Sequence, residues 1–175
     1  MSTYLGGLTV SPGTPVDLGL WTGPGTNSFY PYIFTGSYTD TATISAVVDE
    51  TIPVVGDKLC YSGAFSGRVC SNTVVTTGNL VCYSVSMCYA GETFTHQDAN
   101  TEALGNGDSG GPVYASVSGQ VYAAGTINGE IGGSSTCTGE PGGNGRSCSP
   151  SGIFEPVAYG LGPDTTGWGL LVTSP

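Results

Sequence analysis

The stretch Gly105–Tyr114 reads GNGDSGGPVY and contains the hexapeptide GDSGGP at Gly107–Pro112. Gly, Asp, Ser and Pro are common turn residues, so the hexapeptide predicts a tight loop. In a chain this rich in glycine, the six residues would still occur in this order by chance only on the order of once in several thousand cases. The loop is therefore specific enough to make Ser109 a candidate nucleophile.

The composition around this loop is that of an all-β protein. The chain has 175 residues, about one domain with a core of its own, and it contains 30 Gly and 11 Pro between segments rich in Thr, Ser, Val and Tyr. Short strands joined by close turns predict a sandwich or a barrel. The glycine-rich segment Asn128–Gly152 predicts a long surface loop. The predicted strands, roughly ten in number, are Val16–Trp21, Phe29–Phe34, Thr41–Val48, Lys58–Gly63, Gly67–Val75, Leu80–Tyr89, Gly111–Val117, Gln120–Ile127, Gly152–Val157 and Trp168–Thr173.

The charge of the chain excludes several classes of partner. The formal net charge is −10, and the only basic residues besides one histidine are Lys58, Arg68 and Arg146. A nucleic-acid surface needs clustered cations, so nucleic acid is excluded as a partner. No apolar run approaches the roughly 20 residues of a membrane-spanning helix, so no membrane is expected either. The opening MSTYLGG lacks the basic start and apolar stretch of a signal peptide, so an export segment would lie upstream of Met1.

Six cysteines favour an oxidising compartment, with six free thiols in a cytosolic protein as the alternative. There is no C-x-x-C pair, and His96 is the single histidine, so neither a zinc site nor any other cofactor is predicted. Six cysteines allow 15 pairings. The simplest set joins neighbours in sequence: Cys60 with Cys70, Cys82 with Cys88, and Cys137 with Cys148.

The hexapeptide resembles the nucleophile loop of chymotrypsin-like serine proteases. VGDKLCYSGAFSGRVC at Val55–Cys70 is similar to a hairpin of the small secreted bacterial members, the streptogrisin and α-lytic type, in which the two cysteines pair. GIFEPV and the closing WGLLVT resemble the last strands of these proteins. The resemblance implies a secreted protein with two β-barrels. Residues 54–175 would form the complete second barrel and residues 1–53 a part of the first, whose open strand edges predict aggregation or dimerisation.

The resemblance also implies roles for residues of the loop and of one strand. Ser109 would be the nucleophile, and the backbone amides of Gly107 and Ser109 would form the oxyanion hole. Asp17, in TPVDLGLW, matches the triad aspartate, which would orient an imidazole and stabilise its cation.

A specificity pocket is implied in the same way. Ala103, six residues before Ser109, would line the floor of the pocket, with Asn128 and Gly129 on the facing wall. Because Ala103 carries no acid, a small or medium apolar side chain of a peptide or protein substrate is expected there, rather than Lys or Arg. Glu130 at the rim could favour a basic side chain instead.

One member of the triad is missing from the pattern. The family's chain order is His, Asp, Ser, but residues 1–16 contain no histidine, and His96 reads as a surface histidine. Without an imidazole nearby the serine hydroxyl is a weak nucleophile. We therefore expect the chain alone to be inert, with the base on an N-terminal segment that precedes it.

Three functions follow from these observations. The first is a secreted serine endopeptidase, and the second is a pseudoprotease that binds peptides in the same cleft. The third is an extracellular β-rich structural or adhesion domain in which the motif occurs by chance. Function is argued from the site rather than from the fold, so the geometry around Ser109 decides among them.

Overall fold

The computed structural model describes residues 3–10, 14–22, 30–40, 42–133, 137 and 146–159. Among these the only helical element is the 3₁₀ turn η1, Val157–Tyr159, and no helix is long and apolar enough to cross a membrane. The strands are β1 Thr3–Val10, β2 Thr14–Thr22, β3 Tyr32–Phe34, β4 Ile44–Glu50, β5 Lys58–Gly63, β6 Gly67–Ser84, β7 Met87–Gln97, β8 Leu104–Gly105, β9 Pro112–Val117, β10 Gln120–Ile131, β11 Cys148–Ser149 and β12 Ser151–Pro156.

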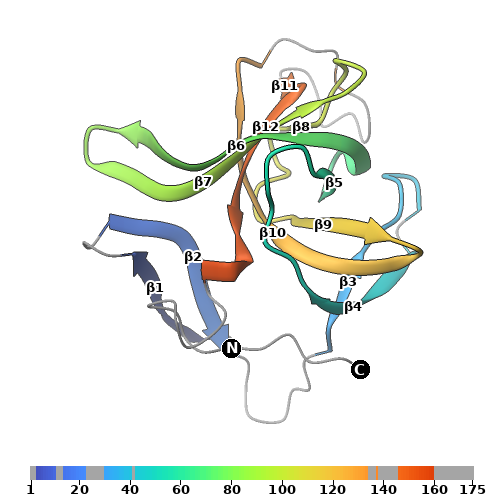
Figure 1. Ribbon diagram of the computed structural model, residues 1–175, viewed down its shortest axis with the longest axis horizontal. Helices are drawn as coiled ribbons and strands as arrows, with labels where there is room; N and C mark the ends of the chain where they lie inside the picture. Colours follow the sequence, from blue (N-terminus) through green and yellow to red (C-terminus); the bar gives the residue numbers. More distant parts are fainter. Residues whose placement is uncertain are drawn as a thin grey trace.

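Six strands pair in a closed ring. The order is β12-β7-β6-β5-β9-β10, and β10 pairs back with β12, so each of the six strands has a neighbour on both sides. Every pairing in the ring is antiparallel. Figure 1 shows these strands wrapped around one another in the upper and middle part of the molecule. Closure removes the open edges that a flat sheet would expose.

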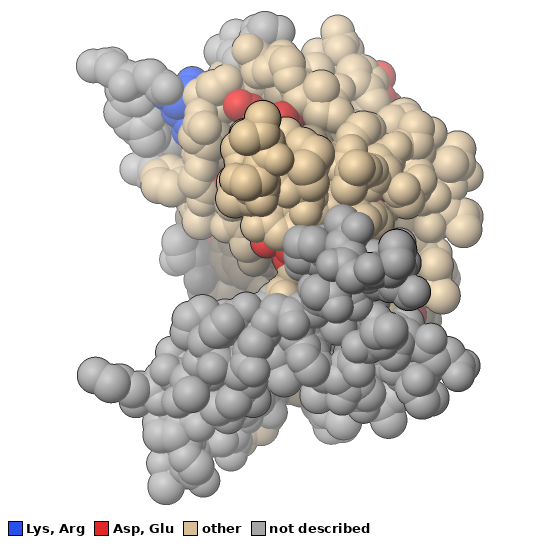
Figure 2. Space-filling model, turned by 90° about the vertical axis from the view of Figure 1, so that its left-hand side faces the viewer, with Lys and Arg blue, Asp and Glu red and all other residues tan. Residues whose placement is uncertain are grey.

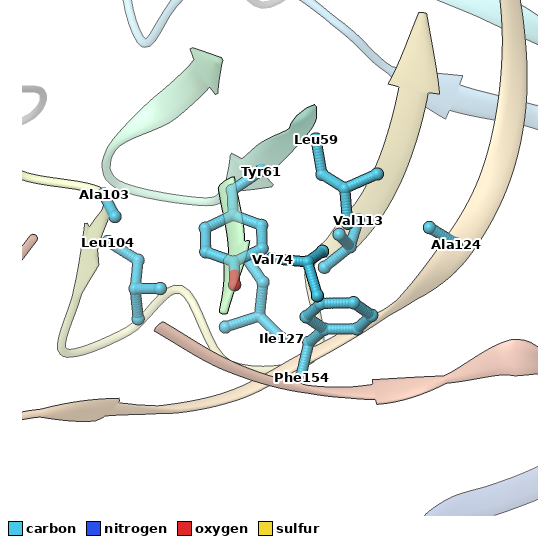
Figure 3. Packing of buried hydrophobic residues seen from close by; sticks show 9 residues of the cluster. All are labelled: Leu59, Tyr61, Val74, Ala103, Leu104, Val113, Ala124, Ile127 and Phe154. Carbon is cyan, nitrogen blue, oxygen red and sulfur yellow. The ribbon is translucent and has the colours of Figure 1, made fainter. Parts of the chain in front are cut away.

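The interior of the ring holds the main hydrophobic core, which Figure 3 shows from close by. Tyr61 packs edge-on against Phe154, with ring centroids 6.2 Å apart, and its hydroxyl lies 2.6 Å from that of Thr95. Leu104 and Val113, on either side of the GDSGGP hexapeptide, both belong to this core. The loop that carries Ser109 is therefore anchored at both ends. The cluster consists of Leu59, Tyr61, Val74, Ala103, Leu104, Val113, Ala124, Ile127 and Phe154.

The N-terminal strands lie outside the ring. β1 and β2 form a separate antiparallel hairpin, which was not predicted at Thr3–Val10, and β2 contacts β7. β3 pairs with β4, and β4 pairs in parallel with β10, so this pair extends the sheet of the ring. The division of the chain at residues 53 and 54 stays a prediction.

The single strand predicted at Leu80–Tyr89 is wrong. This segment spans the end of β6, a turn at residues 85–86 and the start of β7. Cys82 and Cys88 lie opposite each other across the hairpin and form a disulfide. The segment lacks the Gly, Pro, Asn or Asp that usually mark a turn, and this explains the error.

The prediction of a surface loop over Asn128–Gly152 is wrong at both ends, where the chain forms strands. β10 continues to Ile131, and Cys148 and Ser149 form β11, which is buried and pairs with β8. Strand pairing uses the backbone alone, so the high glycine content did not prevent it. All three predicted cysteine pairings are confirmed. The strand predicted at Trp168–Thr173 lies outside the described residues.

Candidate functional site around Ser109

Ser109 is exposed and lies in an open cleft of about 470 Å³. One wall of the cleft is the loop 108–112, and the other is the end of β5 at residues 62–64. The aromatic side chains of Phe34 and Tyr38, from the N-terminal part of the chain, complete the lining. The predicted nucleophile is therefore accessible to a ligand.

The backbone of the nucleophile loop requires glycine at two positions. Gly107 has a φ of 92° and Gly110 a φ of 81°, both in the left-handed region that favours glycine. A Cβ at Gly107 would lie 2.5 Å from the ring of Phe65. Among the described residues, no backbone or side-chain acceptor bonds to the amides of Gly107 and Ser109. Both N–H groups therefore remain free to donate to a ligand oxygen.

Asp108 holds this loop in place from within the protein, since its side chain is fully buried. Its Oδ1 accepts hydrogen bonds from the amides of Phe65 and Ser66, at 2.9 and 3.0 Å, and its Oδ2 accepts one from the amide of Gly105 at 2.8 Å. A side chain at Gly63 would overlap the carboxylate. The hairpin of Cys60 and Cys70 and the nucleophile loop are thus locked together through one aspartate.

Arg146 compensates the charge of Asp108, a role that the sequence analysis did not predict. Its Nη2 donates to Asp108 Oδ2 at 2.6 Å, its Nη1 to Glu102 Oε1 at 3.3 Å, and its Nε to the carbonyl of Asn106 at 3.0 Å. The guanidinium also lies 5.6 Å from the ring centroid of Phe65. The side chain of Arg146 is only 6% exposed. Arg146, two residues before β11, therefore holds three points of the segment that leads to Ser109.

Asp17 lies on β2, and within the described residues its carboxylate accepts no hydrogen bond. Its amide donates to Glu155 Oε2 at 3.1 Å, and partial burial raises the pKa of its carboxyl. The structure therefore does not bring Asp17 into contact with Ser109. It brings Asp17 to a group of two further acids that the sequence did not reveal.

These two acids, Glu92 on β7 and Glu155 on β12, are both fully buried. Burial raises the pKa of Glu92 to about 7, against the opposing effect of a hydrogen bond from Asn128. Burial, together with the charges of Glu92 and Asp17, raises the pKa of Glu155 to about 8. Within the part of the chain that the structure describes, Glu92 Oε2 and Glu155 Oε1 have no hydrogen-bond partner. We name Asp17, Glu92 and Glu155 the acidic cluster.

Asn128 connects the acidic cluster to the nucleophile. Its side-chain amide donates to Glu92 Oε1, and its backbone carbonyl accepts from Ser109 Oγ at 3.3 Å. Of the residues predicted to form the specificity pocket, Asn128 is the one in direct contact with Ser109. A Cβ at its neighbour Gly129 would lie 3.0 Å from the hydroxyl of Tyr83.

Two other residues from the sequence analysis lie outside the cleft. Ala103 is fully buried in the core, where its amide donates to the carbonyl of Ser149 at 2.7 Å. His96 Nδ1 lies 2.9 Å from the hydroxyl of Ser151, on the β7–β12 pair. Neither of them lines the cleft around Ser109. His96 is therefore not placed to take a proton from Ser109.

The acidic cluster makes stability depend on pH. Because the pKa of Glu155 is about 8 in the folded protein, against about 4.5 when solvated, the folded chain keeps a proton that the unfolded chain releases above pH 5. Stability should therefore fall as the pH rises from 5 to 8. We measure the free energy of unfolding of Glu155→Gln and of the parent protein by urea unfolding at pH 5 and pH 8. Relative to the parent, Glu155→Gln should be about 2 kcal/mol more favourable at pH 8 than at pH 5. Asp49→Asn, at an exposed acid, is the control, and an equal Glu155→Gln effect at both pH values would contradict the assignment.

Solved structures of other proteins share the fold of this chain. No family model and no curated protein sequence matches the chain. A glutamic-acid-specific serine protease matches with a TM-score of 0.66 at 20% identity, over 98% of this chain and 73% of that one. Thermobifida fusca Protease A matches with a TM-score of 0.58 at 21% identity, over 99% and 84% of the two chains. Cellulomonas bogoriensis chymotrypsin matches with a TM-score of 0.56 at 23% identity, over 89% and 68%. The fold is that of the bacterial chymotrypsin-like serine proteases.

Proposed function

We propose that this chain, which has the chymotrypsin-like fold, is the part of a secreted serine endopeptidase that carries the nucleophile. The observation that supports this most strongly is the loop Gly107–Ser109, in which two unpartnered amides flank a carboxylate held by several donors. Such a rigid pair of donors can stabilise an oxyanion without reorganising during the reaction. Three disulfides support an extracellular location.

In the proposed reaction, Ser109 Oγ attacks the carbonyl carbon of a peptide bond. Its proton passes to an imidazole base, and the carbonyl oxygen, now negative, accepts hydrogen bonds from the amides of Gly107 and Ser109. The base then protonates the departing amine, and water releases the acyl group from Ser109. In the structure Ser109 Oγ donates to the carbonyl of Asn128, so the hydroxyl must rotate toward the base before it reacts.

The base itself is proposed to come from outside this sequence. His96 is bonded to Ser151, and residues 1–16, which precede Asp17, contain no histidine. Asp17 is proposed to orient this imidazole. The support for this role is that Asp17 interacts electrostatically with Glu92, which is bonded to Asn128, the residue whose carbonyl accepts a hydrogen bond from Ser109.

A pseudoprotease that only binds peptides is the second candidate, and the position of His96 favours it. Both candidates require a peptide to bind at Ser109. We expect an acetylated tripeptide with a free C-terminal carboxylate to shift the amide NMR resonances of Gly107 and Ser109, because that carboxylate would occupy the oxyanion hole. The corresponding peptide alcohol should shift them much less. Shifts confined to residues away from the cleft would argue for a structural or adhesion domain.

The side chain nearest the cleaved bond is proposed to be apolar. The cleft is lined by Phe34, Tyr38 and Pro112, and the acid in its lining, Asp108, is paired with Arg146. A tripeptide ending in leucine should therefore bind at least about tenfold more tightly than one ending in lysine, about 1.4 kcal/mol in binding free energy. Isothermal titration calorimetry on the two peptides measures the ratio. Tighter binding of the lysine peptide would point to Glu130 instead.

A further inference from the structure

We propose that a second hollow in the surface, lined by Arg68 and Tyr114, is a binding site for a carboxylate group. This hollow has a volume of about 210 Å³ and shares no lining residue with the cleft at Ser109. Binding there would therefore not depend on the reactivity of Ser109. We call it the Arg68 hollow.

The Arg68 hollow lies on the outer face of the ring, in the region where β3 and β4 lie beside β9 and β10 (Figure 1). Tyr114 and Ser116 both line it, and residues two apart on a strand point to the same face. Val113 belongs to the core inside the ring, so the face of Tyr114 is the outer one. Cys60 and Cys70 also line the hollow, and their disulfide ties β5 to β6 at this point.

The first observation is a cation without a partner. Arg68 is exposed, and within the described part of the chain its side chain makes no hydrogen bond and no ion pair, whereas Lys58 and Arg146 are both paired with acids. None of the residues that line the hollow is an acid. Cations are scarce in this chain of net charge −10, and on the face shown in Figure 2 basic atoms appear only near one edge. An anion in the hollow would therefore meet an attractive charge without a nearby repulsive one.

The second observation is a buried hydroxyl without a partner. Tyr114 is only 2% exposed, yet its hydroxyl makes no hydrogen bond to any residue that the structure describes. Tyr61 is equally buried, and its hydroxyl lies 2.6 Å from that of Thr95. Buried tyrosine hydroxyls usually have such a partner, so the bare hydroxyl of Tyr114 calls for one. A ligand in the hollow would supply it.

The two groups are placed to act on one ligand. Both line the same hollow, and the charge of Arg68 acts on the hydroxyl of Tyr114: burial raises the pKa of this tyrosine, and Arg68 opposes the rise. The hydroxyls of Thr35 and Ser45, which also line the hollow, bond to each other at 2.7 Å. The guanidinium of Arg68 and the hydroxyl of Tyr114 are therefore the donors that a ligand would use.

These donors fit a carboxylate better than a phosphate. The planar guanidinium can donate two parallel hydrogen bonds to the two oxygens of a carboxylate, and the tyrosine hydroxyl can donate a third. A phosphate carries more charge than one arginine compensates, and the net charge of −10 would add to the repulsion. The carboxylate could belong to a free small molecule or to an acidic side chain of a polypeptide. Pro112, which lines the cleft, lies only about 7 Å along β9 from Tyr114, so a polypeptide in the cleft could reach the hollow.

The test titrates the chain with sodium acetate at low ionic strength and follows the Arg68 Nε–H and the Tyr114 ring by NMR. We expect both signals to shift along one saturating curve. Tyr114→Phe removes one hydrogen bond and keeps the ring, so acetate should bind about fivefold more weakly, as read from Arg68. Arg68→Gln should weaken binding at least tenfold, as read from Tyr114. Lys58→Gln removes an equal charge elsewhere and should leave the affinity unchanged, and the amide spectrum of each variant reports whether it is folded.

Each outcome supports or overturns the site. If acetate shifts neither signal, or binds Arg68→Gln as well as the parent protein, the site is wrong. If inorganic phosphate binds more tightly than acetate, the assignment to a carboxylate is wrong. Two further probes, acetyl-Leu-Glu-amide and acetyl-Leu-Gln-amide, distinguish the sources of the carboxylate once acetate binds. Binding of the glutamate peptide at least tenfold more tightly than acetate, without binding of the glutamine peptide, identifies a polypeptide as the ligand. Equal binding of acetate and the glutamate peptide identifies a free carboxylate.

Discussion

Replacing Arg146 with methionine is expected to lower the free energy of unfolding by about 4 kcal/mol, since one partner of a buried ion pair is removed. Asp108 and Glu102 would remain buried, with side chains 0% and 1% exposed, and without their cation. Methionine keeps most of the length of the side chain, so the change tests the charge and its hydrogen bonds rather than a cavity. Urea unfolding of the two proteins at pH 7 measures the difference.

The matched control is Arg68→Met. Arg68 is exposed, so its loss should cost less than about 1 kcal/mol. Adding Glu102→Gln to Arg146→Met should recover part of the lost stability, because one uncompensated carboxylate is then neutral. The amide NMR resonances of Gly107 and Ser109 should broaden in Arg146→Met alone. A cost below 1 kcal/mol for Arg146→Met would mean that Asp108 does not need this cation.

The second large effect concerns reactivity. Ser109 should react with an alkyl fluorophosphonate on the order of a millionfold more slowly in this chain than in a form extended at its N-terminus to include a triad histidine. The reason is that, in the proposed reaction, the chain supplies the nucleophile and the oxyanion donors but no base, since His96 is bonded to Ser151. Addition of free imidazole to the chain should raise the rate, because it supplies the base in solution.

Two results would contradict this expectation. Appreciable labelling of the chain alone would show that no upstream base is needed, and His96→Ala would then reveal whether His96 acts after all. An extended form that contains a histidine and folds, yet stays inert, would favour the pseudoprotease. In either case the peptide-binding experiments still test whether a peptide binds at Ser109, because binding needs no proton transfer.

The fold could be predicted from a few local signals. GDSGGP and the hairpin of Cys60 and Cys70 both indicate the family fold, and each lies in a segment where turn residues and strand formers alternate clearly. The sequence does contain a sign that Leu80–Tyr89 is not a single strand. A disulfide between Cys82 and Cys88 cannot form within one extended strand, because six residues of strand span about 20 Å, far beyond the 4.4–6.8 Å usual between bonded cysteines.

The candidate site could be predicted only where a motif marks it. The loop and its resemblance indicate Ser109 and Gly107, and the resemblance places Asn128 on the wall of the predicted pocket; the hydrogen bond from Ser109 to Asn128 is known only from the structure. Arg146 lies in a segment predicted to be a surface loop, and Glu155 lies in GIFEPV, which indicated a strand but no role for this acid. Their roles depend on which side chains meet in the folded ring, and local periodicity carries no such information. A weak signal for Arg146 did exist, since a buried aspartate next to the nucleophile needs a cation and the chain has few to offer.

In the proposed function, Ser109 is the nucleophile of a peptide-cleaving site whose base lies outside this sequence. The most direct measurement is the rate of fluorophosphonate labelling, with the modified residue located by mass spectrometry, in an N-terminally extended form and in the same form with its added histidine changed to alanine. We expect rapid labelling at Ser109 in the first protein and almost none in the second. Equal rates in the two proteins, or modification of a residue other than Ser109, would contradict it.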